Sequence, residues 1–106
     1  MEYELKRGKY KDLEGEGLKN IIEEVFGTVT REGDLYVTSY GALKRLEAKL
    51  VGKSALHVST ESDTSVPEEV GVETIKRFNQ FLERATGYTA KERRNRLQKK
   101  ARDGKL

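Results

Sequence analysis

The chain lacks cysteine and tryptophan, and its 106 residues include one proline, one methionine and one histidine. Without cysteine there is no disulfide framework, no thiol catalysis and no cysteine-ligated metal centre. No window of about eighteen apolar residues occurs, so no segment is predicted to cross a membrane. The first residues also lack the basic-then-apolar layout of a signal peptide. We therefore expect a cytoplasmic protein.

Charge is abundant in this chain and unevenly distributed. Charged residues make up 37% of the sequence, and the formal net charge is +3. Residues 91–106 carry eight basic and two acidic side chains, a formal +6. The remaining ninety residues then carry 13 basic and 16 acidic side chains, a formal −3. A mildly acidic body with a strongly basic end suggests contact with a polyanion.

Periodicity in the first third of the chain predicts a strand and a helix. Residues 2–6 alternate between apolar and polar and predict a short strand, and residues 8–17 form a polar, glycine-containing connection. The next segment predicts a helix that ends at Gly27. Five apolar residues fall on one stripe of it: Leu18, Ile21, Ile22, Val25 and Phe26.

A period of two then predicts four strands in the middle of the chain. Residues 28–31 and 35–40 form two of them, separated by a turn. Residues 43–51 fit either a helix or a strand, because their leucines suit one period and their alternating charges the other. We choose the strand because a Gly-Lys turn follows and residues 55–60 alternate again, which predicts a hairpin.

The last third of the chain predicts two helices. Ser65 and Glu68 have the spacing of a capping box and open a helix that ends at Gly87. Thr89 and Glu92 have the same spacing and open a last helix that reaches about Arg102. The apolar residues of the first of these helices are predicted to be buried: Ile75, Phe78, Phe81, Leu82 and Ala85.

These elements predict an α+β fold in the order β-α-β-β-β-β-α, with an antiparallel sheet of about five strands and both helices on one face. We expect one domain over residues 1–87 and a basic helical extension over residues 88–106. The topology of residues 2–87 resembles a single repeat of the TATA-box-binding-protein-like fold. The stretch 86–94, Thr-Gly-Tyr-Thr-Ala-Lys-Glu-Arg-Arg, also resembles the end of small uncharacterised archaeal proteins. Neither resemblance implies an activity.

The basic extension is the first candidate site. Its cations can neutralise several phosphates, and such binding weakens as salt is added. Two other interpretations stay open: a solvated helix whose arginines pair with the acidic body, and a helix that contacts a protein. The predicted polyanion contacts are Lys91, Arg93, Arg94, Arg96, Lys99, Lys100 and Arg102.

Aromatic residues of the strand at 35–40 form the second candidate site. Tyr36 and Tyr40 alternate with Leu35 and Val37, so they are predicted on the open sheet face, beside His57. Tyrosines there can stack unpaired bases, fill a homodimer interface or pack across strands. His57 is capable of general-base chemistry, but a surface position on the sheet explains it more simply.

No catalytic motif is found. Gly52-Lys53-Ser54 resembles the end of a phosphate-binding P-loop, but the glycine required five positions earlier is Glu47 and no helix follows. We therefore expect a non-catalytic protein with no cofactor and no small-molecule ligand. RNA or another polyanion is the favoured partner, and a second copy of the chain is the alternative.

Overall fold

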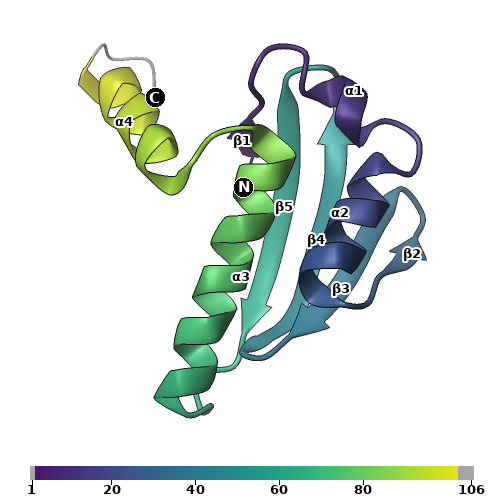
Figure 1. Cartoon of the computed structure of the whole chain (residues 1–106), viewed down its shortest axis with the longest axis vertical. Helices are drawn as coiled ribbons and strands as arrows, with labels where there is room; N and C mark the ends of the chain where they lie inside the picture. The colour runs from purple at the N-terminus through teal and green to yellow at the C-terminus, as the bar shows by residue number, and fades with distance from the viewer. Residues whose placement is uncertain (1, 103–106) are drawn as a thin grey trace.

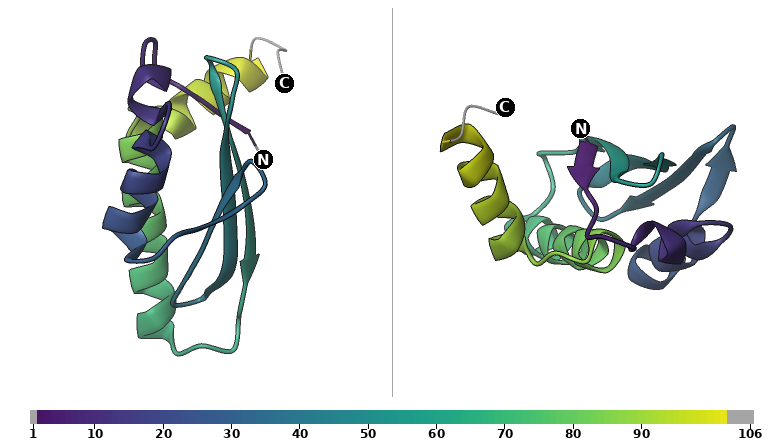
Figure 2. Two further views of the ribbon diagram at one scale, coloured as in Figure 1. Left: turned by 90° about the vertical axis from the view of Figure 1, so that its right-hand side faces the viewer. Right: turned by 90° about the horizontal axis from the view of Figure 1, so that it is seen from above.

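The computed structural model describes residues 2–102, with side chains as far as Gln98. Its elements are β1 (Glu2–Glu4), α1 (Tyr10–Leu13), α2 (Gly17–Phe26), β2 (Thr30–Glu32), β3 (Leu35–Tyr40), β4 (Leu43–Val51), β5 (Ala55–Ser62), α3 (Glu68–Thr86) and α4 (Ala90–Arg102). The strands form one antiparallel sheet in the order β1-β5-β4-β3-β2. α2 and α3 cover one face of this sheet, and α4 leaves the body at the end of α3 (Figure 1 and Figure 2). The predicted α+β class is confirmed, as is the strand over residues 43–51.

The core lies between the sheet and the two long helices. All five apolar residues of the predicted α2 stripe are buried. They meet Leu46 of β4 and Leu56 of β5, both fully buried, while Phe81 is fully buried on α3. Gly27 and Gly87 end α2 and α3 with φ of 88° and 82°, a conformation that side-chain-bearing residues seldom adopt. The sequence therefore places both helix ends correctly.

The segment 8–17 is more ordered than its polar composition predicts. It contains the short helix α1, bracketed by Gly8 and Gly15, which both have positive φ. Leu13 is 2% exposed and joins the core, and Tyr10 packs against the core as well. A single helical turn is too short to produce a periodic signal, which explains why the sequence predicts only a connection.

The predicted face of the β3 tyrosines is wrong. Tyr36 lies across from Ala48 of β4, a fully buried residue, so it points toward the helices and not toward the open face. Its hydroxyl donates to the carbonyl of Gly15 at 3.3 Å. The Tyr40 ring lies 5.7 Å from the ring of Phe26 in α2. Both sides of β3 carry apolar residues, so alternation alone does not identify the buried side.

The open sheet face carries charges that neutralise one another. Arg45 donates to Glu32 at 3.0 Å and to Glu47 at 2.6 Å, so it is paired on two sides. His57 lies on this face across from Lys49, as predicted, and is half-buried. Within the described part of the chain this face holds no tyrosine or phenylalanine. A base-stacking platform on the open face is therefore not supported.

Two further predictions for α3 are wrong. Ile75 is 62% exposed instead of buried, because it lies at the side of the helix and not over the sheet. Ser65 does not cap the helix: its amide and hydroxyl both donate to Asp63, and Pro67 occupies the N-cap position. The exposure of Ile75 leaves an apolar patch beside the sheet.

Candidate nucleic-acid interface

α4 begins at a reciprocal capping box formed by Thr89 and Glu92. The Thr89 amide donates to Glu92 Oε1 at 3.0 Å, and the Glu92 amide donates to Thr89 Oγ1 at 3.1 Å. The hydrogen bonds from Thr89 hold the pKa of Glu92 below its usual value, because they favour the charged carboxylate. The predicted capping box is confirmed, and it fixes the residue at which the basic helix begins.

Arg93 ties the first turn of α4 to α3. Its Nη1 donates to the Tyr88 carbonyl at 2.7 Å, and its Nη2 donates to Asn79 Oδ1 of α3 at 3.3 Å. Burial lowers the pKa of Arg93, since a buried guanidinium loses hydration. Arg93 therefore serves as an anchor inside the molecule, and phosphate would have to displace two hydrogen bonds to reach it.

Arg96 ties the second turn of α4 to the edge of the sheet. Its Nε and Nη2 donate to the two carboxylate oxygens of Glu4 in β1, at 3.1 and 2.6 Å. The same guanidinium lies 4.6 Å from the centre of the Tyr88 ring, within the range of a cation–π contact. The Glu4 hydrogen bonds raise the pKa of Arg96. Both partners are partly exposed, so solvent screens this pair.

A groove of about 260 Å³ separates α4 from the edge strand β1. Tyr3 and Tyr88 contribute aromatic surface to it, and Arg94 and Leu97 line its α4 side. Burial raises the pKa of Tyr3, and the nearby charge of Arg93 acts in the opposite direction. The groove thus combines aromatic walls with an exposed cation.

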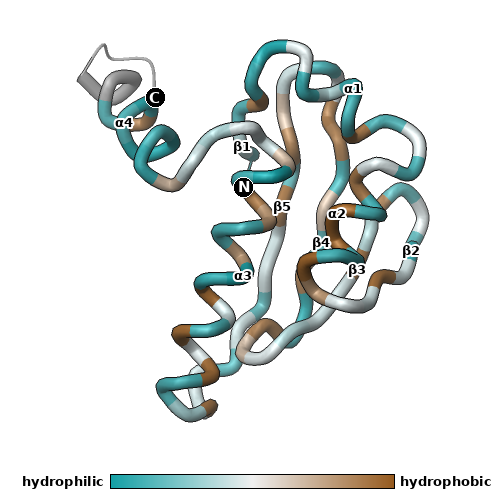
Figure 3. Tube along the Cα trace, viewed as in Figure 1, coloured by the Kyte–Doolittle hydropathy of each residue, from teal (hydrophilic) through white to brown (hydrophobic). Residues whose placement is uncertain are grey.

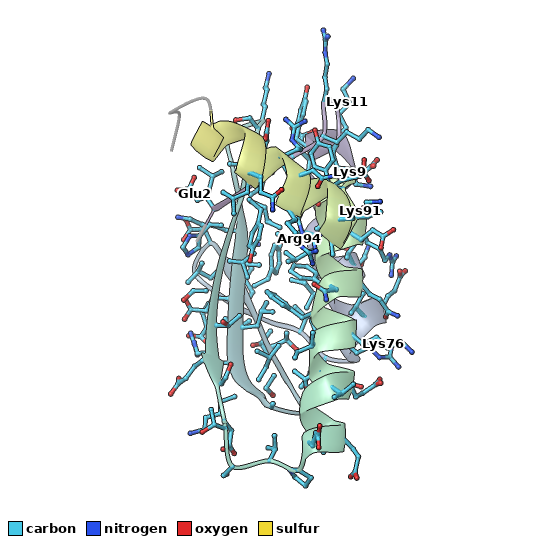
Figure 4. The ribbon with its side chains drawn as sticks, turned by 90° about the vertical axis from the view of Figure 1, so that its left-hand side faces the viewer. Glu2, Lys9, Lys11, Lys76, Lys91 and Arg94 are labelled. Atoms are coloured by element: carbon cyan, nitrogen blue, oxygen red, sulfur yellow. The ribbon has the colours of Figure 1, made fainter. Side chains whose placement is uncertain are left out.

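Cations from the other end of the chain lie against the junction of α3 and α4. A side chain at Gly87 would begin 3.0 Å from Cβ of Lys6 and 3.7 Å from Cδ of Lys9. Arg7 and Lys11 belong to the same segment and are exposed. Figure 4 shows Lys9, Lys11 and Lys91 at the same end of the molecule, with Arg94 below α4. Residues some eighty positions apart in the chain therefore share one basic surface.

We call five residues of this surface the basic pole: Lys6, Arg7, Lys11, Lys91 and Arg94. All five are exposed, and their side chains make no hydrogen bond or ion pair within the described part, although Lys6 lies close enough to Glu92 to interact with it electrostatically. Lys9 differs, because it pairs with Asp12 at 3.2 Å. Exposed cations without an internal partner are the ones that retain their full electrostatic capacity for an external anion.

The structure divides the predicted polyanion contacts into three groups. Lys91 and Arg94 are exposed and belong to the basic pole. Arg93 and Arg96 are engaged by the body, and the pair between Arg96 and Glu4 agrees with the alternative interpretation that arginines of the extension pair with the acidic body. The others have side chains outside the described part: Lys99, Lys100 and Arg102.

The other predicted site residues are not brought together. Tyr36 and Tyr40 lie under the helices, whereas His57 lies on the opposite sheet face. The Tyr40 hydroxyl donates to Glu73 of α3 at 3.3 Å, and the carboxylate also accepts from Arg77. These contacts hold the pKa of Glu73 below its usual value, with Arg77 as the main cause. Tyr40 thus joins the sheet to α3, whereas Tyr36 joins it to Gly15 before α2.

Sequence reasoning missed the contribution of residues 6–11. Four of these six residues are basic, in the order Lys-Arg-Gly-Lys-Tyr-Lys, so the signal was present in the sequence. It was hidden because the body as a whole has a net negative formal charge. The Lys6 amide donates to the Thr86 carbonyl at 2.8 Å, and this bond brings the segment to the start of α4. No pattern in the sequence reveals such a contact.

Residues 2–102 offer neither a metal site nor a membrane span. In that range no group of three or more histidine, aspartate and glutamate side chains is placed to hold a metal ion. No helix there is both long enough and apolar enough to cross a membrane.

Comparison with known proteins gives a fold relative and a family. A solution NMR structure, of the hypothetical protein TA0095 from Thermoplasma acidophilum, is similar to this chain at 28% identity and a TM-score of 0.60. The match covers 91% of this chain and 95% of the other. Among curated proteins, none matches. The model of a domain of unknown function, DUF5611, matches residues 1–99, and the chain therefore belongs to the DUF5611 family.

Proposed function

We propose that this protein binds RNA through the basic pole, with the phosphate backbone as the main contact. The observation that carries the proposal is the convergence of the segment 6–11 with the start of α4, which gathers five exposed cations whose side chains make no hydrogen bond or ion pair within the described part. Cations that neutralise phosphates release condensed counterions, and this release favours binding at low salt.

The anchoring of α4 supports the proposal in a second way. Arg93 and Arg96 hold the helix against the body, so Lys91 and Arg94 are presented in fixed positions. A fixed cationic surface loses less conformational entropy on binding than a free tail does. The contacts of Arg93 and Arg96 with the body therefore help RNA binding by fixing the orientation of the basic helix.

The groove beside α4 favours an unpaired strand over a duplex. Proteins recognise single-stranded RNA by stacking its exposed bases on aromatic side chains and by contacting the adjacent phosphates. Tyr3 and Tyr88 line the groove, and Arg94 lines its α4 side. One base in the groove would leave its phosphate close to the basic pole. We expect weak sequence preference, because an aromatic ring can stack on any base.

The test is fluorescence anisotropy with a labelled single-stranded RNA across a salt series. Replacing Lys91 and Arg94 by alanine removes two contacts, so the log–log salt slope should fall by about 1.4 and affinity at low salt by at least about tenfold. Replacing Arg7 and Lys11 by alanine should act in the same direction. A duplex DNA of equal length should bind more weakly than the RNA.

The matched control removes the same charge elsewhere. Arg31 and Lys44 are exposed and lie outside the basic pole, so replacing both by alanine should change affinity by less than about threefold. The proposal is wrong if this control weakens binding as much as the variants of the basic pole do. Binding that stays constant between about 50 and 200 mM salt would also contradict it.

A further inference from the structure

One side of α3 is exposed and apolar in a protein rich in charge. Val72 is 60% exposed and Ile75 is 62% exposed, and the only other large apolar side chain so exposed in the described part is Leu97 of α4. The hydropathy-coloured trace shows several apolar positions along the first half of α3 (Figure 3). Large apolar side chains that cluster on a surface mark an interaction site more often than single ones do.

The spacing of this patch is that of a helix-packing seam. Glu68, Val72, Ile75 and Asn79 fall at i, i+4, i+7 and i+11, which places them along one line of the helix. The two central positions are apolar and the two outer ones are polar. A groove of about 520 Å³, largely apolar, runs beside this seam between α3 and the end of β5. The body of the protein leaves the seam uncovered.

We propose that a second copy of the chain packs on this seam, with the two α3 helices antiparallel about a two-fold axis between Val72 and Ile75. In that arrangement Val72 of each copy meets Ile75 of the other, and Glu68 of each copy meets Asn79 of the other. A two-fold interface joins the same patch on both subunits, so the patch must complement itself. This inference is independent of RNA binding.

The polar ends of the seam complement each other under this axis. The Asn79 side-chain oxygen already accepts from Arg93, so its amide nitrogen remains as a donor for an outside acceptor. The Glu68 carboxylate is exposed and accepts from no residue of the described part. One end of the seam therefore offers a donor and the other end an acceptor, as antiparallel pairing requires.

The residues flanking the seam show the same complementarity. Glu69 and Lys76 both follow a seam position directly, and both are exposed. Antiparallel packing about the proposed axis brings Glu69 of one copy to the same rim as Lys76 of the other, with opposite charges. A parallel arrangement would instead place Glu68 beside Glu68 at one end of the seam and Asn79 beside Asn79 at the other. Charge complementarity thus selects the antiparallel second copy.

The first experiment is sedimentation equilibrium of the full chain over a range of concentrations. We expect a monomer–dimer equilibrium, and Ile75→Glu should raise its dissociation constant by at least about tenfold by placing a charge in the apolar centre. Asn20→Glu is the matched control: Asn20 is exposed on α2, away from the seam, so this variant should leave the equilibrium unchanged. Circular dichroism of both variants should match that of the unmodified chain, because neither residue is buried.

The second experiment tests the register. The chain has no cysteine, so Val72→Cys and Ile75→Cys each introduce a single thiol. Under oxidation, a mixture of the two variants should form disulfide-linked dimers faster than either variant alone. A single monomeric species up to about 1 mM would overturn the proposal, and so would equal effects of Ile75→Glu and Asn20→Glu. Fastest cross-linking by Val72→Cys alone would overturn the antiparallel arrangement.

Discussion

The body of the protein and α4 are held in place by different kinds of interaction. In the body, fully buried apolar side chains from the sheet and both long helices meet in one cluster. In α4, the one large apolar side chain described, Leu97, is 51% exposed. The helix is held instead by the guanidinium groups of Arg93 and Arg96 and by its capping box.

The basic helix is therefore attached to the body by polar contacts, and its described residues lie outside the apolar core. Burial of a large apolar side chain stabilises a fold by roughly 1.5–3 kcal/mol, whereas an exposed ion pair contributes about 0–1 kcal/mol. The pair between Arg96 and Glu4 belongs to the second class, since both side chains are about 40% exposed. A phosphate can therefore compete for Arg96 without unfolding the body.

The largest expected difference in the free energy of unfolding is between truncating one apolar residue of the body and truncating one of α4. Phe81 is fully buried, and its ring lies 5.7 Å from that of Phe26, so Phe81→Ala should lower the free energy of unfolding by about 3–5 kcal/mol. Leu97→Ala should lower it by less than about 0.5 kcal/mol. Urea denaturation followed by circular dichroism measures both. Comparable losses for the two variants would show that α4 belongs to the core after all.

Much of this contrast could be predicted from the sequence. The stripe from Leu18 to Phe26 has helical spacing and is wholly buried, because one helix face must cover the sheet. The Gly52-Lys53 turn resolved the ambiguity of residues 43–51, since a tight turn between two alternating segments specifies a hairpin. Local patterns predicted these elements correctly because the spacing of residues within one helix or one hairpin is sufficient to specify it.

Prediction failed where the answer depends on contacts between distant segments. The period of two in β3 fixes which residues share a face, but only packing against α2 decides that Tyr36 and Tyr40 are the inner ones. Similarly, the periodicity of α3 marks Ile75 as apolar without revealing whether its own sheet covers it. The basic residues of segment 6–11 become part of the candidate site only because Lys6 and Lys9 lie close to Gly87, just before the start of α4.

An intermediate effect is expected at the junction between the two regions. The buried Thr86 hydroxyl accepts from the Tyr88 amide at 3.2 Å, so Thr86→Val removes the acceptor and should lower stability by about 1 kcal/mol. Amide exchange at Tyr88 should also accelerate. The matched control is Thr74→Val, because Thr74 accepts from the Ala42 amide within the body. If Thr74→Val accelerated exchange at Tyr88 equally, the junction would have no distinct role.

The smallest expected effect is a pH-dependent loss of stability at the start of α4. The pKa of Glu92 is lowered in the folded chain by its hydrogen bonds with Thr89, so the stabilisation it provides is present above its ordinary value of 4.5. It is lost as the pH falls through the lower, folded pKa, because the neutral acid is a weaker acceptor. NMR titration should show the Thr89 amide shifting in this range while amides of the buried core stay constant.

Glu92→Gln is the control for this titration, since glutamine keeps an acceptor for the Thr89 amide but does not ionise. In this variant the pH response of the Thr89 amide should disappear while the helix start persists at neutral pH. A Glu92 carboxyl that titrates at its ordinary value would mean that the capping box does not form in solution. In that case the basic helix would lack a fixed beginning, and its attachment would depend on Arg93 and Arg96 alone.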